Sequence, residues 1–498
     1  FTMHRITPDQ VQPLHDSAGT RRLEQAAAAL LPPHTLMQRA GLTVARLALA
    51  VAPHARCIWL ACGPGNNGGD GLEAAVHLQR WGLNPLVTWL GDEAHLPADA
   101  HASLQRARAA GVRFADAPPQ LGAGDLCIDA LLGLGASRAP EGQLRDWITA
   151  LNASPAPTLA IDVPSGLNSD TGQHLGDAPH ATVQAQHTLT LLSCKPGLFT
   201  AQGRDAAGSV WFDDLGVDAA HEPPCAHINI TPPHHPRPHA SHKGSNGDVA
   251  ILGGEGLAAR GMGMSGAALL AASAALHGGA GRVLVCLLDG GSLTADPIQP
   301  ELMLRSLPAL GRLDAAGLTV VCGCGGGMAV REPLARVLTE APRLVLDADA
   351  LNAIASDTAL RAQLRARQSL GWATVLTPHP LEAARLLQSS SAQVQANRLA
   401  AAQQLVTELG AVVVLKGSGS VVAGPGQIPV INLTGNAKLA AAGTGDVLAG
   451  LIGARLAQGD SPWAAACAAV YQHGARADEW PEGRTLTASA LARRLTAD

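Results

Sequence analysis

Short apolar runs alternate along this chain with longer segments in which apolar residues recur every three or four positions. Apolar runs of about four to eight residues are typical of buried strands, and the periodic segments are typical of amphipathic helices. Their regular alternation predicts βαβ units and parallel sheets. The alternation occurs twice, with one interruption near the middle of the chain.

The N-terminal series begins with a long helical segment at roughly 20–51. Further helices are predicted near 70–81, 99–111 and 142–151, and strands at 56–62, 85–90, 125–132, 158–163 and 187–192. The C-terminal series predicts strands at 248–254, 281–288, 318–323, 343–349, 373–378 and 411–417, followed by 55 mainly helical, alanine-rich residues. Each series predicts one α/β domain, and open α/β sheets bind ligands at the carboxyl ends of their strands.

Residues 221–240 are rich in proline and histidine and lack apolar periodicity, which is typical of a linker. We therefore predict domains at 3–220 and 241–498. A chain of 498 residues is also long for a single hydrophobic core.

Composition favours a folded protein that acts on small molecules. Hydrophobic residues make up 47% and charged residues 15%, and the net charge is -5 without a basic run. These values argue against nucleic acid or an anionic membrane as the main partner. The longest stretch of small apolar residues, 265–276, is too short to span a bilayer, and no signal peptide is visible, so we expect a cytoplasmic protein.

The nine cysteines are expected to be reduced, because they are odd in number and form no C-x-x-C pair. Cys322 and Cys324 form C-x-C, but no second pair accompanies them. Zinc is therefore disfavoured there.

A glycine-rich loop, "CGPGNNGGDGL" at 62–72, follows the first predicted strand. Its glycines fit G-x-G-x-x-G and Asp92 stands where a ribose-binding acid would follow, so an NAD dehydrogenase is one interpretation. Against it, Asn66, Asn67 and Asp70 supply more polar groups than a pyrophosphate turn requires.

Two further predicted strands end in polar side chains. Asp129 ends one strand, and Asp162 and Ser165 follow the next. A single strand-end Asp is often only a turn or cap residue, but Asn67, Asp129 and Ser165 would converge on one sheet edge. Their oxygens suit a hard cation.

The C-terminal half contains no G-x-x-x-x-G-K-[ST] loop, so any nucleotide must be bound differently. "VLKGSGSVV" at 414–422 is either a simple hairpin turn or a loop whose amides and Lys416 hold phosphates. In "AAAGTGDVLAG" at 440–450, residues 443–445 begin a helix and would form an anion hole. Asp446 is then either a helix cap or a base that takes a proton from an attacking hydroxyl.

The N-terminal half resembles NAD(P)H-hydrate epimerases over most of 20–215, on the strings "LMQRAG" (36–41), "GPGNNGGDG" and "DVPSGL". The resemblance implies a Rossmann-like fold and interconversion of the R and S forms of hydrated NADH or NADPH. It implies K⁺ at Asn67, Asp129 and Ser165, with Asp162 nearest the reacting ring. The implied hydrate contacts are Asn66, Asn67, Gly68, Gly69, Asp70, Gly133, Leu134, Gly135, Ala136, Ser137, Arg138, Ala139 and Asp162. Leu134 departs from the family's usual threonine.

The C-terminal half resembles ADP-dependent NAD(P)H-hydrate dehydratases, which are ribokinase-like α/β sandwiches. Six strings carry this resemblance in order: "HKGSNGDVAILGG", "SGAALLAASAALHGGAG", "LDADALNA", "LTPHPLEAARLL", "LKGSGSVV" and "GNAKLAAAGTGDVLAG". The resemblance implies Mg²⁺ with ADP, Asp446 as the base, and Asn352 and Glu382 near phosphate or magnesium. The implied nucleotide contacts are Lys416, Gly417, Ser418, Gly419, Ser420 and Gly445, and the implied hydrate contacts are Ala267, Gly325, His379 and Asp446.

Three positions bear on this second assignment. His379 in "PHP" also fits a rigid turn, "GCGGG" at 323–327 replaces the family's Gly-Pro-Gly-Leu-Gly, and Lys438 stands in a normally neutral loop. Taken together, the resemblances imply a bifunctional repair enzyme that epimerises hydrated NADH and NADPH and uses ADP to dehydrate the S form, releasing AMP and phosphate. We also expect a homo-oligomer. A vitamin or sugar kinase, and a nucleotide-binding scaffold with a silent first domain, are the alternatives.

Overall fold

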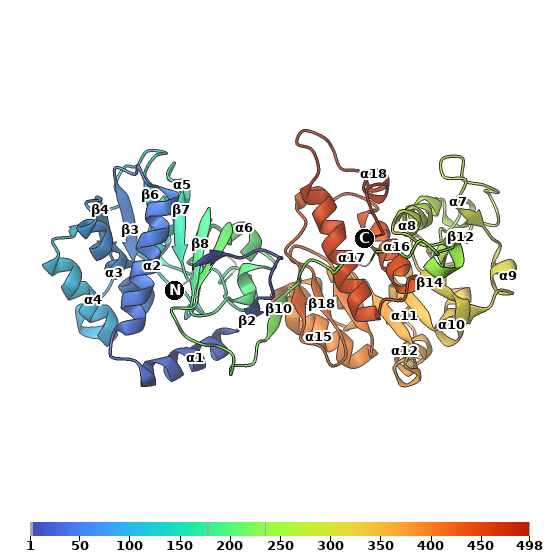
Figure 1. The fold of residues 1–498 in the computed structure, drawn as a ribbon, viewed down its shortest axis with the longest axis horizontal. Coiled ribbons are helices and arrows are strands. Elements are labelled where there is room, and N and C mark those ends of the chain that lie inside the picture. Colours follow the sequence, from blue (N-terminus) through green and yellow to red (C-terminus); the bar gives the residue numbers. More distant parts are fainter. Residues whose placement is uncertain (1–2, 177–178, 235, 498) are drawn as a thin grey trace. The chain divides into compact units, whose positions relative to one another are not determined.

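The computed structural model describes residues 3–176, 179–234 and 236–497, which fold into two compact units (Figure 1). The first contains the chain up to residue 7 and 12–227, and the second contains 8–11 and the chain from residue 228. The division lies inside the segment predicted as a linker. That segment is not wholly irregular, because Ala226–Ile228 forms strand β10, whose Ala226 and Ile228 are buried and which pairs with β2 (Pro13–Leu14).

The first unit is built on a sheet in the order β1-β9-β8-β7-β6-β3-β4-β5, parallel except where β1 meets β9. The five predicted strands form its centre as β3 (Ile58–Cys62), β4 (Pro85–Trp89), β6 (Leu126–Ala130), β7 (Thr158–Ile161) and β8 (His187–Leu191). Three short strands were not predicted: β1 (His4–Arg5), β5 (Arg113–Ala115) and β9 (Ser209–Asp213).

Apolar cores lie on both faces of this sheet. Ile58 and Leu60 of β3 face one core, which includes residues of four helices: α1 (Ser17–Leu30), α2 (Thr35–Val51), α3 (Asn66–Arg80) and α4 (Ala98–Ala109). Trp59 faces the other core, which contains Trp147 of α5 (Gly142–Ala153). Burial on both faces explains why the strands are continuous apolar runs. A short helix, α6 (Gly203–Ala207), precedes β9.

The long helix predicted at roughly 20–51 is instead two helices. Leu31 ends α1 in an extended conformation, and His34 before α2 has a left-handed φ of 66°. Pro32 and Pro33 lie between them and cannot donate helical hydrogen bonds, which is the physical reason for the break.

The sheet of the second unit contains the strand order β13-β12-β11-β14-β15-β16-β17-β18-β19. Pairing is parallel from β13 to β17 and antiparallel beyond it. All six predicted strands are present: β11 (Asp248–Gly253), β12 (Arg282–Leu287), β14 (Leu318–Cys322), β15 (Arg343–Leu346), β16 (Ala373–Leu376) and β17 (Val412–Leu415). The edges add β13 (Met303–Leu304), β18 (Val421–Ala423) and β19 (Val430–Ile431).

Two helices of small residues pack closely in the second core. A side chain at Gly450 of α16 (Thr444–Ala457) would lie 2.0 Å from the carbonyl oxygen of Ala271 in α8 (Ser265–His277). The remaining helices are α7 (Leu257–Arg260), α9 (Leu307–Leu310), α10 (Arg331–Glu340), α11 (Asp349–Ala355), α12 (Thr358–Ala366), α13 (Pro380–Leu386), α14 (Ser391–Ala396), α15 (Arg398–Leu409), α17 (Pro462–Asp478) and α18 (Ala488–Ala492).

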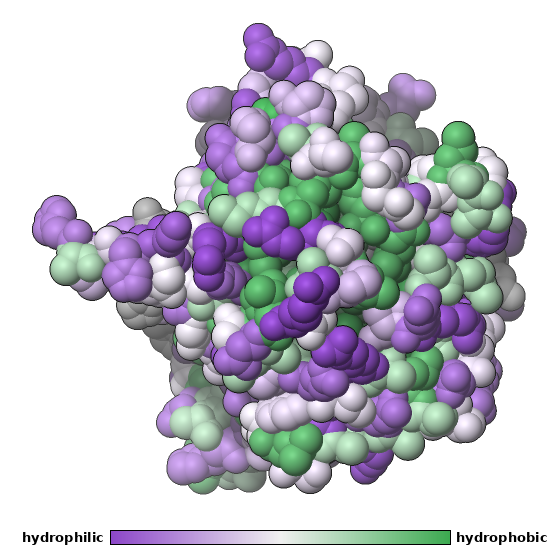
Figure 2. All heavy atoms as spheres, turned by 90° about the vertical axis from the view of Figure 1, so that its right-hand side faces the viewer, coloured by the Kyte–Doolittle hydropathy of each residue, from purple (hydrophilic) through white to green (hydrophobic). Residues whose placement is uncertain are grey.

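The surface of the second unit mixes polar and apolar groups, and on the face in Figure 2 apolar groups lie between polar ones. Exposed apolar side chains of this unit include Leu257 and Ile298. Within the described residues, no helix has both the length and the apolar character that a membrane span needs.

Candidate active sites

The first unit contains a cavity of about 480 Å³ at the carboxyl ends of its central strands. Residues of α1, α2 and the start of α3 line it, together with the loops that follow β6, β7 and β8. The cavity brings together seven of the residues predicted from the sequence: Asn66, Asn67, Asp70, Leu134, Gly135, Ala136 and Asp162.

Asp162 follows β7 and has a left-handed φ of 67°, which turns the chain sharply at the cavity. Its Oδ1 lies 2.5 Å from Nζ of Lys195, which is fully buried. Lys195 also donates to the carbonyl oxygens of Leu191 and Ser193, at 2.7 and 2.9 Å. A buried lysine with these partners fixes the position of the Asp162 carboxylate.

Other carboxylates face the same cavity. Burial raises the pKa of Asp70 well above its usual value, and the negative charges of Asp162 and Glu24 add to the effect. The pKa of Glu24 is raised for the same reasons, burial first and Asp162 second. The cavity therefore holds one carboxylate paired with a lysine beside others that favour the protonated form.

Asp129 and Ser165 are both buried, and neither is among the residues that line the cavity. Ser165 donates to Asp129 from its hydroxyl at 2.6 Å and from its amide at 2.8 Å, and the amide of Leu131 donates at 3.2 Å. Burial raises the pKa of Asp129, and these neutral donors oppose that shift. Asn67 lies against the loop that follows β6, since a side chain at Gly133 would lie 2.9 Å from its Cγ, and its buried Nδ2 has no hydrogen-bond partner.

The other predicted residues of the first unit have different positions. Gly68 and Gly69 pack inside the first turn of α3, where a side chain would collide with the Gly63 carbonyl or with Met37. Gly133 has a φ of 87°. Six predicted hydrate contacts are not among the residues that line the cavity: these three glycines together with Ser137, Arg138 and Ala139.

The second site lies where β14, β15, β16 and β17 end beside the start of α16. Asp347 follows β15 and is buried. Its Oδ1 accepts hydrogen bonds from Thr377 at 2.8 Å and from Nζ of Lys416 at 3.0 Å. Burial alone would lower the pKa of Lys416, but the charges of Asp347, Glu382 and Asp446 raise it. Lys416 is therefore a fixed positive charge at the centre of the site.

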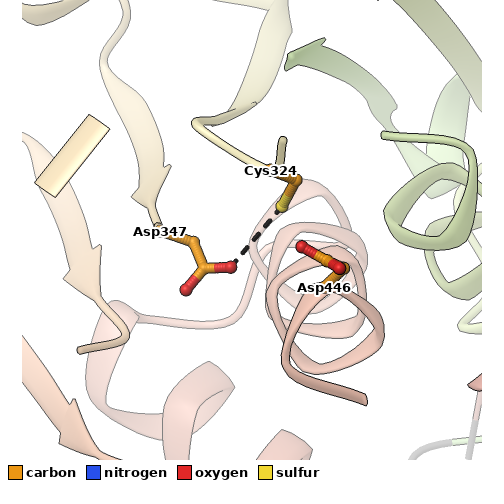
Figure 3. A group of neighbouring side chains, drawn as sticks. All are labelled: Cys324, Asp347 and Asp446. Carbon is orange, nitrogen blue, oxygen red and sulfur yellow. Dashed lines mark hydrogen bonds between the residues drawn. The ribbon is translucent and has the colours of Figure 1, made fainter. Parts of the chain in front are cut away.

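Asp446 lies in the first turn of α16 and points toward Asp347 and Cys324 (Figure 3). Burial raises its pKa to about 7, and Asp347 reinforces the shift while Lys416 and the Cys324 thiol oppose it. A carboxylate with a pKa near neutrality exchanges a proton readily at physiological pH, as a general base must. The environment of Asp446 therefore suits a general base as well as a helix cap.

Several glycines lie in the second site, where the backbone conformation or the close neighbours leave little room for a side chain. Gly443, with a φ of 87°, precedes α16, and a side chain at Gly445 would lie 3.0 Å from Nζ of Lys416. A side chain at Gly325 would lie 2.9 Å from Cβ of Ala267, so these two predicted residues are neighbours. Residues 416–420 join the antiparallel strands β17 and β18. They thus form a hairpin loop that also carries Lys416 into the site.

His379 is a helix cap as well as a candidate ligand. Its Nδ1 accepts from the amides of Leu381 and Glu382, and Glu382 accepts from the amide of His379 at 2.9 Å. Burial lowers the pKa of His379 and raises that of Glu382 to about 7. Asn352 accepts from Arg385 at 2.8 Å.

The sequence prediction missed two central residues, Lys195 and Asp347. Asp347 carried a usable signal, because it directly follows a run of apolar residues as Asp129 and Asp162 do. The only signal for Lys195 was that lysine is scarce in this chain, which has four lysines among 35 basic residues.

Comparisons with known proteins match both halves. A family model described as NAD(P)H-hydrate dehydratase matches residues 251–497, and one described as YjeF-related protein N-terminus matches 33–197. The bifunctional NAD(P)H-hydrate repair enzyme Nnr of Escherichia coli K12 is 37% identical, over 92% of this chain and 88% of the relative. The enzyme of the same name from Vibrio cholerae is 36% identical, over 95% and 93%.

Solved structures match the second unit. One is an ADP/ATP-dependent NAD(P)H-hydrate dehydratase from Bacillus subtilis co-crystallised with ATP and Mg²⁺. It is 29% identical with a TM-score of 0.42, and the match covers 52% of this chain and 90% of that one. A ribokinase-like superfamily protein from Enterococcus faecalis is 25% identical with a TM-score of 0.43, covering 52% and 89%.

Proposed function

The chain belongs to the family of bifunctional NAD(P)H-hydrate repair enzymes, and from that premise we propose how its two sites divide the work. The first site interconverts the R and S hydrates of NADH and NADPH. The second dehydrates the S hydrate with ADP and releases AMP and phosphate. The observation that carries the proposal is that the second site holds the Lys416–Asp347 ion pair together with Asp446, a second carboxylate whose pKa is about 7.

In the first site, Asp162 is the candidate for contact with the reacting ring. It faces the cavity and is fixed by Lys195, so its carboxylate is held in one place without being withdrawn from the substrate. Hydrate contacts are proposed for the cavity residues Asn66, Asn67, Asp70, Leu134, Gly135 and Ala136.

A potassium ion at Asn67, Asp129 and Ser165 fits the first unit. Asp129 is a fully buried carboxylate whose hydrogen-bond donors are neutral, and burying such a charge is costly unless a cation compensates it. Carboxylate, hydroxyl and amide oxygens are also the ligands that hard cations take. When bound, the ion supplies positive charge at these residues.

In the second site, Asp446 accepts the proton of the hydrate's C6 hydroxyl, whose oxygen then takes the terminal phosphoryl group of ADP. Phosphate subsequently leaves C6, and a proton leaves the adjacent ring carbon C5, as the double bond between these two carbons reforms. Residues 416–420 and Gly445 are proposed to hold the nucleotide phosphates, through backbone amides and the charge of Lys416. Ala267, Gly325 and His379 are proposed to contact the hydrate, and Glu382 offers an oxygen to the Mg²⁺ that accompanies ADP.

Three variants test which site carries out which reaction. Asp446→Asn should abolish ADP-dependent recovery of NADH from S-hydrate while R-to-S conversion continues. Asp162→Ala, and the closer replacement Asp162→Asn, should stop R-to-S conversion while dehydration of S-hydrate continues. Near-normal dehydration in Asp446→Asn, or unchanged epimerisation in both Asp162 variants, would exclude the assigned role.

A further inference from the structure

Three potential metal ligands from three elements meet in the second site (Figure 3). Cys324 follows β14, Asp347 follows β15, and Asp446 lies in α16. One ligand atom of each lies within 4.8 Å of the other two, and no other such cluster of three His, Cys, Asp or Glu side chains occurs within the described part of the chain. The cluster combines one sulfur with two carboxylates.

The distance between two of the donors fits one edge of a tetrahedral zinc site. Sγ of Cys324 lies 3.6 Å from Oδ2 of Asp347. With Zn–S near 2.3 Å and Zn–O near 2.0 Å, the sulfur–oxygen edge of a tetrahedron is about 3.5 Å. Lys416 and Thr377 both bond Oδ1 of Asp347, so Oδ2 faces the cysteine. The two donors are therefore placed for a common ion without moving the Lys416 pair.

The sulfur distinguishes this cluster from a magnesium site. Mg²⁺ is bound by oxygen ligands, whereas thiolates select zinc and other soft cations. Cys324 stands in "GCGGG", where the family pattern has proline, so the thiol is a departure of this chain from that pattern. In the sequence, zinc is disfavoured at the C-x-C pair because no second pair of ligands accompanies it, whereas the structure brings carboxylates from distant segments to Cys324 and leaves Cys322 outside the cluster.

We propose that Cys324, Asp347 and Asp446 bind a thiophilic divalent cation, Zn²⁺ in the cell, and that the bound ion inhibits the second site. The inhibition rests on the proposed function, because the ion occupies the carboxylate of Asp446 that would otherwise accept the hydroxyl proton. The binding itself does not depend on that function. Epimerisation in the first unit should be unaffected, since no residue of the cluster belongs to it.

Cd²⁺ titration of the full-length protein tests the binding. Cadmium–thiolate bonds absorb in the ultraviolet, whereas histidines of the 221–240 segment would not produce that band. The wild type should develop the band with one equivalent of Cd²⁺, and Cys324→Ala and Cys324→Ser should lose it. Cys322→Ala is the matched control, because Cys322 is equally buried but outside the cluster. A band that persists in folded Cys324 variants, or that is lost in Cys322→Ala, would overturn the assignment.

The activity measurement separates this proposal from the proposed function. One equivalent of Zn²⁺ should remove most dehydration of S-hydrate, with excess Mg²⁺ present, and should leave R-to-S conversion unchanged. The Zn²⁺ concentration that halves the dehydration rate should be at least tenfold higher for Cys324→Ala than for Cys322→Ala. A Cys324-dependent cadmium band in a protein that never dehydrates the hydrate would refute the proposed function alone. An active enzyme without that band would refute the metal site alone.

Discussion

At the scale of single residues, the second site depends on one lysine that faces several carboxylates. Lys416 is bonded to Asp347, while Asp446 lies in the first helical turn with a pKa raised to about 7. Carboxylates in one site with different environments can take different roles, one positioning and one exchanging protons. We therefore propose a positioning role for Asp347 and proton transfer by Asp446.

The pH dependence of dehydration tests that assignment. Because Asp446 must be ionised to accept a proton, the rate should fall as pH drops below about 7, approaching tenfold per pH unit. Glu382 also has a pKa of about 7, so Glu382→Gln is the control. Removing the negative charge of Glu382 should lower the pKa of Asp446 and move the acidic fall in rate to lower pH. If the rate of Glu382→Gln no longer fell at acidic pH, Glu382 would instead be the titrating group.

Lys195→Met tests the positioning of Asp162. The variant leaves a partly buried carboxylate without its cation, a change that costs about 3–5 kcal/mol in comparable buried pairs. We expect loss of epimerisation and earlier urea unfolding of the first unit, with dehydration retained. Adding Asp162→Asn should restore part of the stability without restoring epimerisation. Unchanged epimerisation in the single variant would rule out the positioning role.

Strand-end carboxylates were the residues that sequence could identify. Asp129 and Asp162 each follow an apolar run, and the same rule, applied to 343–349, would have found Asp347. Lys195 could not be found this way. Its partners depend on how the segment after β8 folds back onto Asp162, which no local spacing encodes.

At the scale of elements, the central strands were predictable because helices cover both faces of each sheet and leave continuous apolar runs. Short edge strands such as β5 lacked that signal, since Arg113 and Phe114 are exposed. Helix α3 begins at Asn66, earlier than the predicted 70, because its first turn is the glycine-rich loop itself.

Substitutions of His379, at the start of α13, can distinguish a role in helix capping from a role in ligand binding. His379 caps this helix through Nδ1, and asparagine is also a good N-cap. His379→Asn should therefore change the free energy of unfolding by less than about 1 kcal/mol while raising KM for S-hydrate. His379→Ala, which lacks any cap, should lose about 1 kcal/mol as well. An unchanged KM in His379→Asn would limit this histidine to capping.

The potassium site proposed at the ends of β6 and β7 can be tested by thermal stability, without an activity assay. A cation that binds only the folded state raises its stability. The melting temperature of the first unit should be higher in KCl than in choline chloride at equal ionic strength, and Asp129→Asn should abolish the difference. Equal melting temperatures of the wild type in the two salts would contradict a potassium site.

At the scale of the whole molecule, each compact unit has its own sheet, its own core and its own candidate site. The two activities should therefore be separable by single substitutions. The sequence could predict this two-part organisation because the βαβ pattern occurs twice around a proline-rich segment. It did not predict that β10 lies within that segment, since three residues carry too little pattern.

Recovery of NADH from an equal mixture of R- and S-hydrates, with ADP and Mg²⁺, tests the central claim most directly. We predict that the wild type recovers all of the hydrate, that Asp162→Asn recovers only the S half, and that Asp446→Asn recovers none, with one AMP and one phosphate formed for each NADH. Accumulation of a stable phosphorylated nucleotide, or complete recovery by Asp446→Asn, would contradict the account.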